Sequence, residues 1–202
     1  MIAILDYGSG NLRSAQKAFA TSGHEVVITA DRKVALEAEG LVVPGVGSFQ
    51  SCMKGLVSID GDSIIRQRLG LERPTLGICI GMQILFENGV EPTRADASPS
   101  HGVGIWSGSV SKMLAPILPH MGWNTVEVNE RSTLFRGIAD QSFYFVHSYA
   151  ATRSVGKLQA WSEYGQRFLA AVEDGPITAT QFHPEKSGSA GLRLIKNWTD
   201  SL

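Results

Sequence analysis

Residues 74–86 place the strongest constraint on how this 202-residue chain can fold. Residues 75–78 form a short apolar run after a proline, which is typical of a buried strand. Residues 82–87 follow and consist largely of residues that favour a helix. We therefore expect a buried strand that turns sharply into a helix, with Cys79 at the turn.

Cys79 has a glycine two residues away on each side, at Gly77 and Gly81. A sharp strand-to-helix turn leaves no room for β-carbons beside the turning residue. The pattern G-x-C-x-G is the thiol counterpart of the nucleophile elbow, and free N–H groups at the helix start would favour a thiolate. A lone cysteine is more often a small buried apolar residue, so a catalytic function requires a base elsewhere in the chain.

Strand-like and helical segments alternate along the first half of the chain. The expected strands are residues 1–5, 25–29, 41–43 and 75–78. The expected helices are residues 12–22, 31–38, 49–56 and 63–69. This alternation predicts an α/β fold with a mostly parallel, doubly wound sheet, in which functional residues lie at the carboxyl ends of the strands.

The second half of the chain has a different pattern, with short strand-like runs separated by turn residues. These runs are residues 123–128, 142–147, 157–161, 168–172 and 177–182. They predict an antiparallel extension of the sheet. Residues 187–202 should form a final helix with Ser187 as its N-cap, and residues 91–101 a surface loop. We expect residues 1–202 to form one domain.

Composition excludes several classes of protein. A net charge of −1 gives no electrostatic basis for binding nucleic acid or an anionic membrane. The apolar runs are too short to span a membrane, and the first residues resemble a strand rather than a signal peptide. Two cysteines do not make a disulfide framework, so we expect a cytoplasmic protein in which Cys52, within an expected helix, is structural.

The candidate base lies in the segment His183-Pro184-Glu185, which follows the extended run over residues 178–182. Proline keeps the preceding residue extended, and residues i and i+2 of an extended chain project to the same side. Glu185 could therefore hold one ring nitrogen of His183 and fix its tautomer. Taken alone, this pattern is more typical of a surface pair, but together with Cys79 it predicts a Cys-His-Glu triad at one edge of the sheet.

Two further observations concern ligands. Gly45 and Gly47 bracket Val46 after an expected strand, which gives a backbone that can present N–H groups to a ligand and reorient a peptide plane. Taken alone, the segment is more typical of a simple glycine-rich turn. The five histidines are scattered and lack metal-binding spacing, so we expect no metal site.

Residues 77–83 and 183–185 resemble the signature of class I glutamine amidotransferases. Residues 6–14, 44–47 and 120–124 are similar to those glutaminase subunits of the family that supply ammonia to a cyclase in histidine biosynthesis. The resemblance runs from the first expected strand to the last helix, and the length suits a free-standing subunit. Ile80 is a departure, since leucine is more usual there, but this residue should contribute mainly its backbone N–H.

The resemblance implies that Cys79 attacks glutamine, that His183 acts as acid and base, and that Glu185 orients His183. It implies an oxyanion hole formed by the N–H of Ile80 and a main-chain N–H at Val46 or Gly47. The implied substrate-binding residues are Gln83, Glu91, Ser148 and Tyr149. The implied contacts with the cyclase partner are Asn11, Trp123 and Lys186. No cofactor is implied, and the partners are glutamine and the cyclase, in a heterodimer with an ammonia channel.

Three other functions remain open at this stage. The chain could be the glutaminase subunit of another amidotransferase, such as anthranilate synthase, although residues 6–8 and Trp123 argue against it. It could be a cysteine hydrolase that acts without a partner. It could also be a non-catalytic module that only binds a partner, but the presence of Cys79, His183 and Glu185 argues against that.

Overall fold

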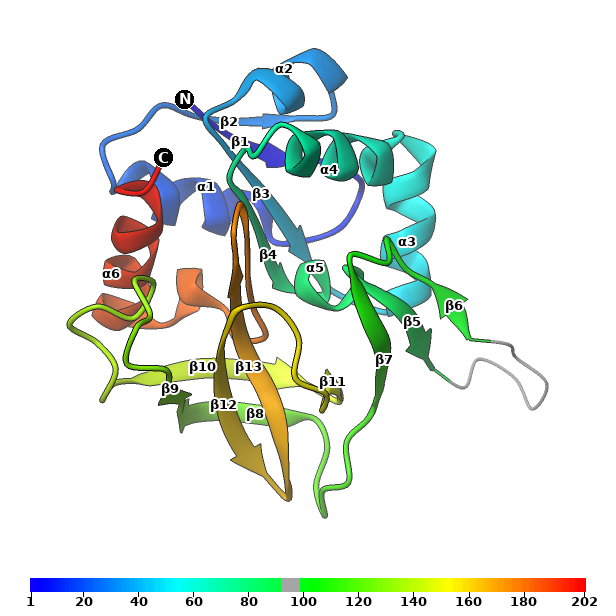
Figure 1. The fold of residues 1–202 in the computed structure, drawn as a ribbon, viewed down its shortest axis with the longest axis vertical. Helices are drawn as coiled ribbons and strands as arrows, with labels where there is room; N and C mark the ends of the chain where they lie inside the picture. Colours follow the sequence, from blue (N-terminus) through cyan, green and yellow to red (C-terminus); the bar gives the residue numbers. More distant parts are fainter. Residues whose placement is uncertain (92–98) are drawn as a thin grey trace.

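The structure, a computed structural model, describes residues 1–91 and 99–202. The parallel part of its main sheet consists of β1 (Ile2–Leu5), β2 (Val26–Thr29), β3 (Gly40–Gly45), β4 (Thr75–Cys79) and β14 (Ile177–Thr180). These strands are ordered β2-β1-β3-β4-β14, and every neighbouring pair is parallel (Figure 1). Their residues are almost entirely apolar because both faces of the sheet are covered. The predicted parallel α/β sheet is confirmed.

Antiparallel strands extend the sheet beyond β14. They are β13 (Gln166–Asp174), β12 (Leu158–Tyr164) and β9 (Glu127–Val128). The predicted antiparallel extension is thus also confirmed, but the single strand expected over residues 123–128 was wrong. The chain instead forms β8 (His120–Thr125), which pairs with β10 (Ser142–His147) in a separate ribbon, and then β9. At this change of partner the Ser162 hydroxyl donates to the carbonyl oxygen of Thr125 at 2.8 Å, which ties the chain to β12.

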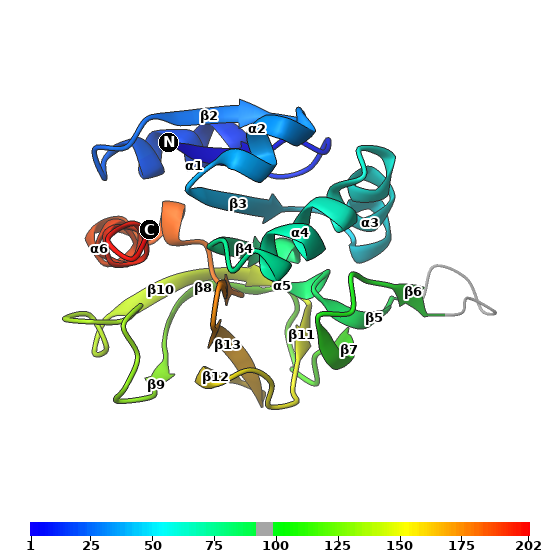
Figure 2. The same ribbon diagram turned by 45° about the horizontal axis from the view of Figure 1, so that its top comes forward.

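Helices cover both faces of the parallel strands. They are α1 (Leu12–Ala20), α2 (Arg32–Glu37), α3 (Phe49–Ser58), α4 (Gly61–Gly70) and α6 (Gly188–Thr199). Figures 1 and 2 show α1 and α6 to one side of β3 and β4, and α3 and α4 to the other. Phe19 of α1 and Trp198 of α6 pack edge to face with 5.8 Å between ring centroids. Within the described part of the chain, no helix is long and apolar enough to cross a membrane.

The helix expected over residues 82–87 was wrong. Helix α5 (Ile80–Gln83) has only four residues, and the chain then enters β5 (Phe86–Val90). That strand belongs to a four-stranded sheet of order β11-β7-β5-β6, completed by β6 (Ser100–His101), β7 (Trp106–Lys112) and β11 (Tyr149–Ala151). The ring of Phe86 lies against Trp106, with centroids 5.5 Å apart, so tertiary packing overrides the local helix preference.

The surface loop expected over residues 91–101 was wrong at its end, because Ser100 and His101 form β6 and pair with β5. Residues 92–98 of that expected loop lie outside the described residues.

Arg68 of α4 is fully buried, so its charge lies in the core. None of its hydrogen-bond partners within the described residues is a carboxylate. Its guanidinium instead donates to Thr75 Oγ1 and to the carbonyl oxygens of Ala35, Leu36, Ala38, Glu39 and Pro74, at distances of 2.6–3.3 Å. Several of these carbonyls are the free ones at the end of α2. Burial, with a smaller contribution from Arg73, lowers the pKa of Arg68 to about 10, so the cation persists at neutral pH and joins α2, α4 and β4.

Replacing Arg68 with methionine should destabilise the fold strongly, because the new side chain fills similar space but leaves buried carbonyl groups without donors. We expect the free energy of unfolding to fall by about 3 kcal/mol or more. Urea denaturation measures this change, and Arg193→Met on the exposed side of α6 is the matched control. Equal midpoints for the two variants would contradict a structural role for the Arg68 hydrogen bonds.

Candidate active site

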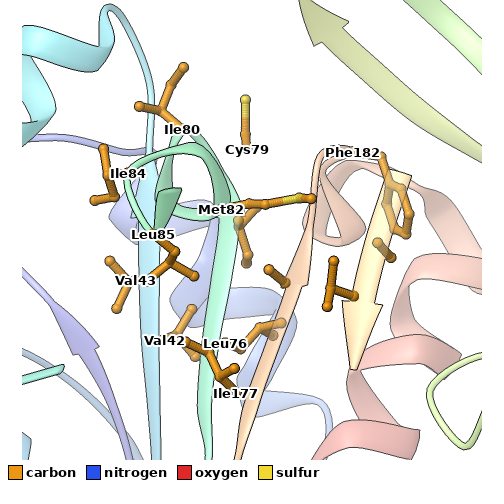
Figure 3. Packing of buried hydrophobic residues seen from close by; sticks show 14 of the residues in the cluster. Val42, Val43, Leu76, Cys79, Ile80, Met82, Ile84, Leu85, Ile177 and Phe182 are labelled. Carbon is orange, nitrogen blue, oxygen red and sulfur yellow. The ribbon is translucent and has the colours of Figure 1, made fainter. Parts of the chain in front are cut away.

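Cys79 lies at the carboxyl end of β4, in a backbone conformation with φ of +57° and ψ of −111° that non-glycine residues rarely adopt. A β-carbon on Gly77 would lie 2.6 Å from the carbonyl oxygen of Gly81. One on Gly81 would lie 1.8 Å from the carbonyl oxygen of Val43. Both glycines are therefore required for the turn. Figure 3 shows the Cys79 sulfur pointing away from the apolar residues packed around β4.

Helix α5, which follows Cys79, is shorter than expected, and this limits its electrostatic effect on the thiol. A four-residue helix has little macrodipole, so the expected support for a thiolate is limited to the first free N–H groups. Ile80 is the first residue of α5, and its N–H has no acceptor one turn earlier within the helix. This N–H is adjacent in sequence to the thiol-bearing residue, where an oxyanion donor would be needed.

His183 and Glu185 are in direct contact, with Nδ1 of the histidine 2.7 Å from Oε1 of the glutamate. Both side chains are buried, with exposed fractions of 3% and 4%. The two side chains meet for a different geometric reason than expected. Pro184 begins a 3₁₀ turn, η1 (Pro184–Lys186), rather than an extended segment. Ser187 supports this turn by donating to the carbonyl oxygen of His183 at 2.7 Å. It occupies the expected N-cap position of α6, but its side chain makes no cap hydrogen bond there.

Burial alone would lower the pKa of His183, but contacts with Cys79 and then with Glu185 outweigh it and raise the pKa to about 10. His183 therefore holds its proton at neutral pH, between a carboxylate and a sulfur. Because Nδ1 faces Glu185, Nε2 is the ring nitrogen left to exchange a proton with a reacting group. The structure thus brings the three predicted residues together in an arrangement suited to nucleophilic catalysis.

A cavity of about 600 Å³ opens beside Cys79. Its lining residues are Val46, Gly47, Ser48, Cys79, Ile80, Gln83, Glu91, Pro119, Val146, His147, Ser148, Tyr149, His183 and Lys186. All the residues predicted for the oxyanion hole and for substrate binding lie among them. Of the residues predicted to contact a partner, Lys186 lines the cavity, whereas Asn11 and Trp123 do not.

Two residues that line this cavity each carry a buried acceptor with no hydrogen-bond partner within the described residues, namely Oε1 of Gln83 and Oε2 of Glu91. The rest of each side chain is held in place. Nε2 of Gln83 donates to the carbonyl oxygen of Tyr149 at 2.8 Å, and Oε1 of Glu91 accepts from the N–H of Phe49 at 2.9 Å. Fixed, unsatisfied acceptors in a cavity are suited to bind a ligand with N–H donors.

Gln181 was missed at the sequence level. Its Nε2 donates to the sulfur of Cys79 at 3.7 Å, and its Oε1 accepts from Gln83 at 2.9 Å. The sulfur also contacts the carbonyl oxygen of Val146 at 3.9 Å. An amide directly after β14, two residues before His183, was the available signal.

A buried histidine pair, also missed, supports the cavity wall. His147 Nε2 lies 3.1 Å from His120 Nδ1, and His147 Nδ1 lies 3.0 Å from the carbonyl oxygen of Tyr149. A carbonyl only accepts, so His147 carries its proton on Nδ1 and His120 must donate to His147. Burial lowers the pKa of His147 to about 3 and that of His120 to about 4, so both rings are neutral.

The three predicted partner-contact residues lie on different elements. Asn11 is exposed, and its side chain caps α1 by accepting from the N–H of Ser14 at 3.4 Å. Trp123 on β8 is 58% exposed and packs edge to face on Tyr144 with 6.0 Å between centroids. Lys186 is exposed at the rim of the cavity.

Comparisons with known proteins identify the family of this chain. A family model described as glutamine amidotransferase class-I matches residues 3–201. A curated relative from Nocardia farcinica, named imidazole glycerol phosphate synthase subunit HisH, is 56% identical over 211 residues, covering 100% of this chain and 98% of the relative. A relative of the same name from Mycolicibacterium paratuberculosis is 55% identical over 205 residues, with the same coverage. A crystal structure described as a glutamine amidotransferase superposes with a TM-score of 0.72 at 18% identity, covering 98% of both chains.

The free energy of unfolding should fall as the pH falls from about 6.5. His120 and His147 then bind protons in the unfolded chain but stay neutral in the folded chain, where they are buried. Each of these histidines contributes a slope of up to roughly 1.4 kcal/mol per pH unit until its folded pKa, about 4 or about 3, is reached. His183 acts in the opposite direction, since its raised pKa contributes stability below 6.5 that is lost as the pH rises through about 10.

Urea titrations between pH 4 and pH 10 would measure both slopes. A His120→Phe variant should have a shallower acid slope, whereas His101→Gln at an exposed position should not. Identical acid slopes for the native chain and His120→Phe would contradict this account.

Proposed function

The chain belongs to the class I glutamine amidotransferase family, and on that basis we propose that it is the glutaminase subunit of imidazole glycerol phosphate synthase in histidine biosynthesis. The observation that carries this proposal is the contact of a protonated His183 with Glu185 beside the Cys79 thiol, at the floor of a cavity. Full-length identity of 56% to a relative of that name supports the same assignment over other amidotransferases. We further propose that residues 1–202 act as one glutamine amidotransferase domain.

In the first half of the proposed reaction, the proton of the Cys79 thiol has passed to His183, and the resulting thiolate attacks the side-chain carboxamide carbon of glutamine. The carbonyl oxygen becomes an oxyanion as the carbon–sulfur bond forms. His183, which already carries its proton, donates that proton from Nε2 to the departing nitrogen as the carbon–nitrogen bond breaks. Ammonia leaves, and a thioester of glutamate remains on Cys79.

In the second half, water attacks the thioester carbon. The now neutral His183 removes a proton from this water, and Glu185 stabilises the imidazolium that forms again. Cleavage of the carbon–sulfur bond releases glutamate and restores the Cys79 and His183 pair. Each proton that His183 gives in the first half is thus recovered in the second.

The oxyanion requires main-chain donors, which we assign to the N–H of Ile80 and to an N–H at Val46 or Gly47. All three residues line the cavity. Removing one such donor typically costs about 2.7–4 kcal/mol of barrier, or on the order of 100- to 1,000-fold in rate. A segment in which Gly47 has φ of +93° accepts backbone angles closed to other residues, so its peptide planes are suited to reorient.

The substrate has a cationic amino group, a carboxylate and a carboxamide, and the cavity offers partners for them. We propose that the unsatisfied oxygens of Glu91 and Gln83 accept hydrogen bonds from the ammonium group. Ser148 and Tyr149, at the start of β11, are proposed to hold the carboxylate end. This arrangement presents the carboxamide carbon to the sulfur of Cys79.

We propose that the protein works in the cytoplasm as a heterodimer with the cyclase subunit, which receives the ammonia through a channel. Free ammonia would be protonated and lost in bulk water, so the reaction needs a sealed path between the subunits. The exposed residues Asn11, Trp123 and Lys186 are the proposed contacts, and Lys186 lies where the cavity meets the surface. Both cysteines are free thiols, in keeping with a reducing compartment.

Cys79→Ala should lower glutamate release, measured with the cyclase present, by roughly a thousandfold or more. Alanine adds no bulk at the turn, so the unfolding midpoint should change little. In the native chain an electrophilic glutamine analogue should label Cys79 and spare Cys52, which is fully buried and whose pKa is raised chiefly by burial. Labelling of Cys52 in the Cys79→Ala protein at an undiminished rate, measured by peptide mass spectrometry, would refute the assignment.

Lys186→Ala should weaken the coupling between glutamine hydrolysis and cyclase product more than it weakens glutamine binding. The reason is that Lys186 is exposed at the cavity rim, where ammonia would pass to the partner. The measurement is the ratio of glutamate to cyclase product, with Lys157→Ala at an exposed position outside the cavity as control. An unchanged ratio in Lys186→Ala would remove this residue from the proposed interface.

A further inference from the structure

Gln181 is a buried amide beside the nucleophile, and the proposed reaction gives it no role. It follows β14 directly, and its backbone N–H donates to the carbonyl oxygen of Ala170 at 2.8 Å. Its side-chain Nε2 donates to the sulfur of Cys79 at 3.7 Å. Gln181 does not belong to the described lining of the cavity, so it contacts the reacting sulfur without occupying the space that a substrate would fill.

The direction of this amide is fixed by a chain of hydrogen bonds that begins at a backbone carbonyl. The carbonyl oxygen of Tyr149 only accepts, so the amide atom of Gln83 that lies 2.8 Å away must be its Nε2. The same Nε2 lies 2.9 Å from the amide of Gln181, where it needs an acceptor, so that atom is Oε1 of Gln181. Nε2 of Gln181 is therefore the end that faces the sulfur. Exchanging the two ends of Gln181 would bring two donors together.

The groups that hold this direction have little freedom of their own. Nδ1 of His147 also donates to the carbonyl oxygen of Tyr149, at 3.0 Å, so both lone pairs of that oxygen are occupied. Gln83 uses its Nε2 for both of its hydrogen bonds, which leaves its Oε1 without a partner within the described residues. Gln83 and Gln181 are each only 1% exposed, so bulk water does not compete for their amides.

The sulfur of Cys79 has one partner suited to each of its protonation states. The carbonyl oxygen of Val146, 3.9 Å away, only accepts and therefore favours the thiol, which can donate its S–H. The N–H of Gln181 donates and therefore favours the thiolate, because hydrogen bonds to a charged group are the stronger ones. An amide of the opposite direction would present its oxygen and favour the thiol. The direction of the Gln181 amide thus decides which form of Cys79 it stabilises.

The titratable groups around the sulfur do not supply such a neutral donor. Those that line the cavity or act electrostatically on Cys79 are Tyr7, Cys52, Glu91, His147, His183 and Lys186. Burial raises the pKa of Tyr7 and of Cys52, which stay protonated, and lowers the pKa of His147 to about 3, so that ring is neutral. His183 is the cation in contact with the sulfur, since its contacts outweigh burial and raise its pKa to about 10. Gln181 adds an N–H whose presence does not depend on pH.

We propose that Gln181 is a catalytic residue that stabilises the thiolate of Cys79 by donating its amide N–H to the sulfur, and that Gln83 holds this amide in the donating direction. The inference rests on the proposed function, since it adds a group to the same site. The proton of the thiol moves to Nε2 of His183, and the N–H of Gln181 binds the negative charge left on the sulfur. When the carbon–sulfur bond of the thioester breaks, its electron pair returns to the sulfur and meets the same N–H.

Gln181→Met tests the donor in the isolated chain, with iodoacetamide as a small probe of the Cys79 thiolate. Methionine fills similar space but has no N–H, so the thiolate loses a hydrogen bond worth roughly ten- to hundredfold in an equilibrium. Labelling of Cys79 is followed by peptide mass spectrometry from pH 4 to pH 9. On the acid side the rate, relative to its own plateau at high pH, should be lower by about that factor. Gln67→Met, at an exposed position of α4 outside the cavity lining, should match the native profile.

Gln83→Met tests whether the amide direction matters, because it leaves Gln181 in place but removes the group that orients it. Its labelling profile should be displaced in the same direction by a smaller factor. The double variant Gln83→Met/Gln181→Met should be no more displaced than Gln181→Met alone, since the effect of Gln83 passes through Gln181. A Gln181→Met profile that coincides with the native profile would overturn the proposal. If Gln181→Met does not unfold cooperatively in urea, a coinciding Gln83→Met profile would overturn it instead.

Glutamate release by the complex with the cyclase separates this proposal from the proposed function. In Gln181→Met the acid limb of kcat/KM should be displaced to higher pH, while KM at high pH stays nearly unchanged because Gln181 lies outside the cavity lining. A native complex that releases glutamate, together with coinciding labelling profiles, would overturn the role of Gln181 alone. A native complex that releases no glutamate would overturn the proposed function, and the labelling profiles of the isolated chain would still decide whether Gln181 stabilises the thiolate.

Discussion

The close approach of the Cys79 turn to β3 is the constraint on which the site depends. Gly81 lies so near the carbonyl oxygen of Val43 that no β-carbon fits between them, and a β-carbon on Gly45 would lie 2.6 Å from the backbone nitrogen of Gly81. These two glycines thus let two backbones touch where side chains would otherwise hold them apart. The consequence is chemical, because this contact sets the thiol of Cys79 beside the segment after β3 that carries Val46.

Outside the pair of His183 and Glu185, two buried polar networks are satisfied by neutral acceptors and donors rather than by opposite charges. Arg68 binds backbone carbonyls, and His120 and His147 form a chain of hydrogen bonds whose direction is set by the carbonyl of Tyr149. Such networks are costly when incomplete, so each one fixes the elements that it joins. The histidine chain ends on the carbonyl oxygen that also receives Gln83, which connects the second half of the fold to the substrate side of the cavity.

The elements that could be predicted from sequence are those whose cause is local. The strand before Cys79, the glycines around it and the pairing of His183 with Glu185 depend on residues a few positions apart. The strand β5 and the sheet that it joins could not be found in this way, because Phe86 becomes a strand residue through contact with the distant Trp106. Gln181 was missed for the same reason, since its partner Cys79 is far away in the chain.

The buried contact of His183 with Glu185 limits where glutaminase activity could be regulated. His183 and Glu185 are buried and in contact, and the pKa of His183 is already raised to about 10, so the acid, its orienting carboxylate and the neighbouring thiol need no further assembly. A glutaminase with a complete triad could still avoid wasting glutamine only if another requirement of the transition state were missing. A main-chain oxyanion donor, as proposed above, meets that condition, because an oxyanion contact lowers the barrier without affecting the binding of ground-state glutamine. Control at such a proposed donor would change kcat and leave the contact of His183 with Glu185 undisturbed.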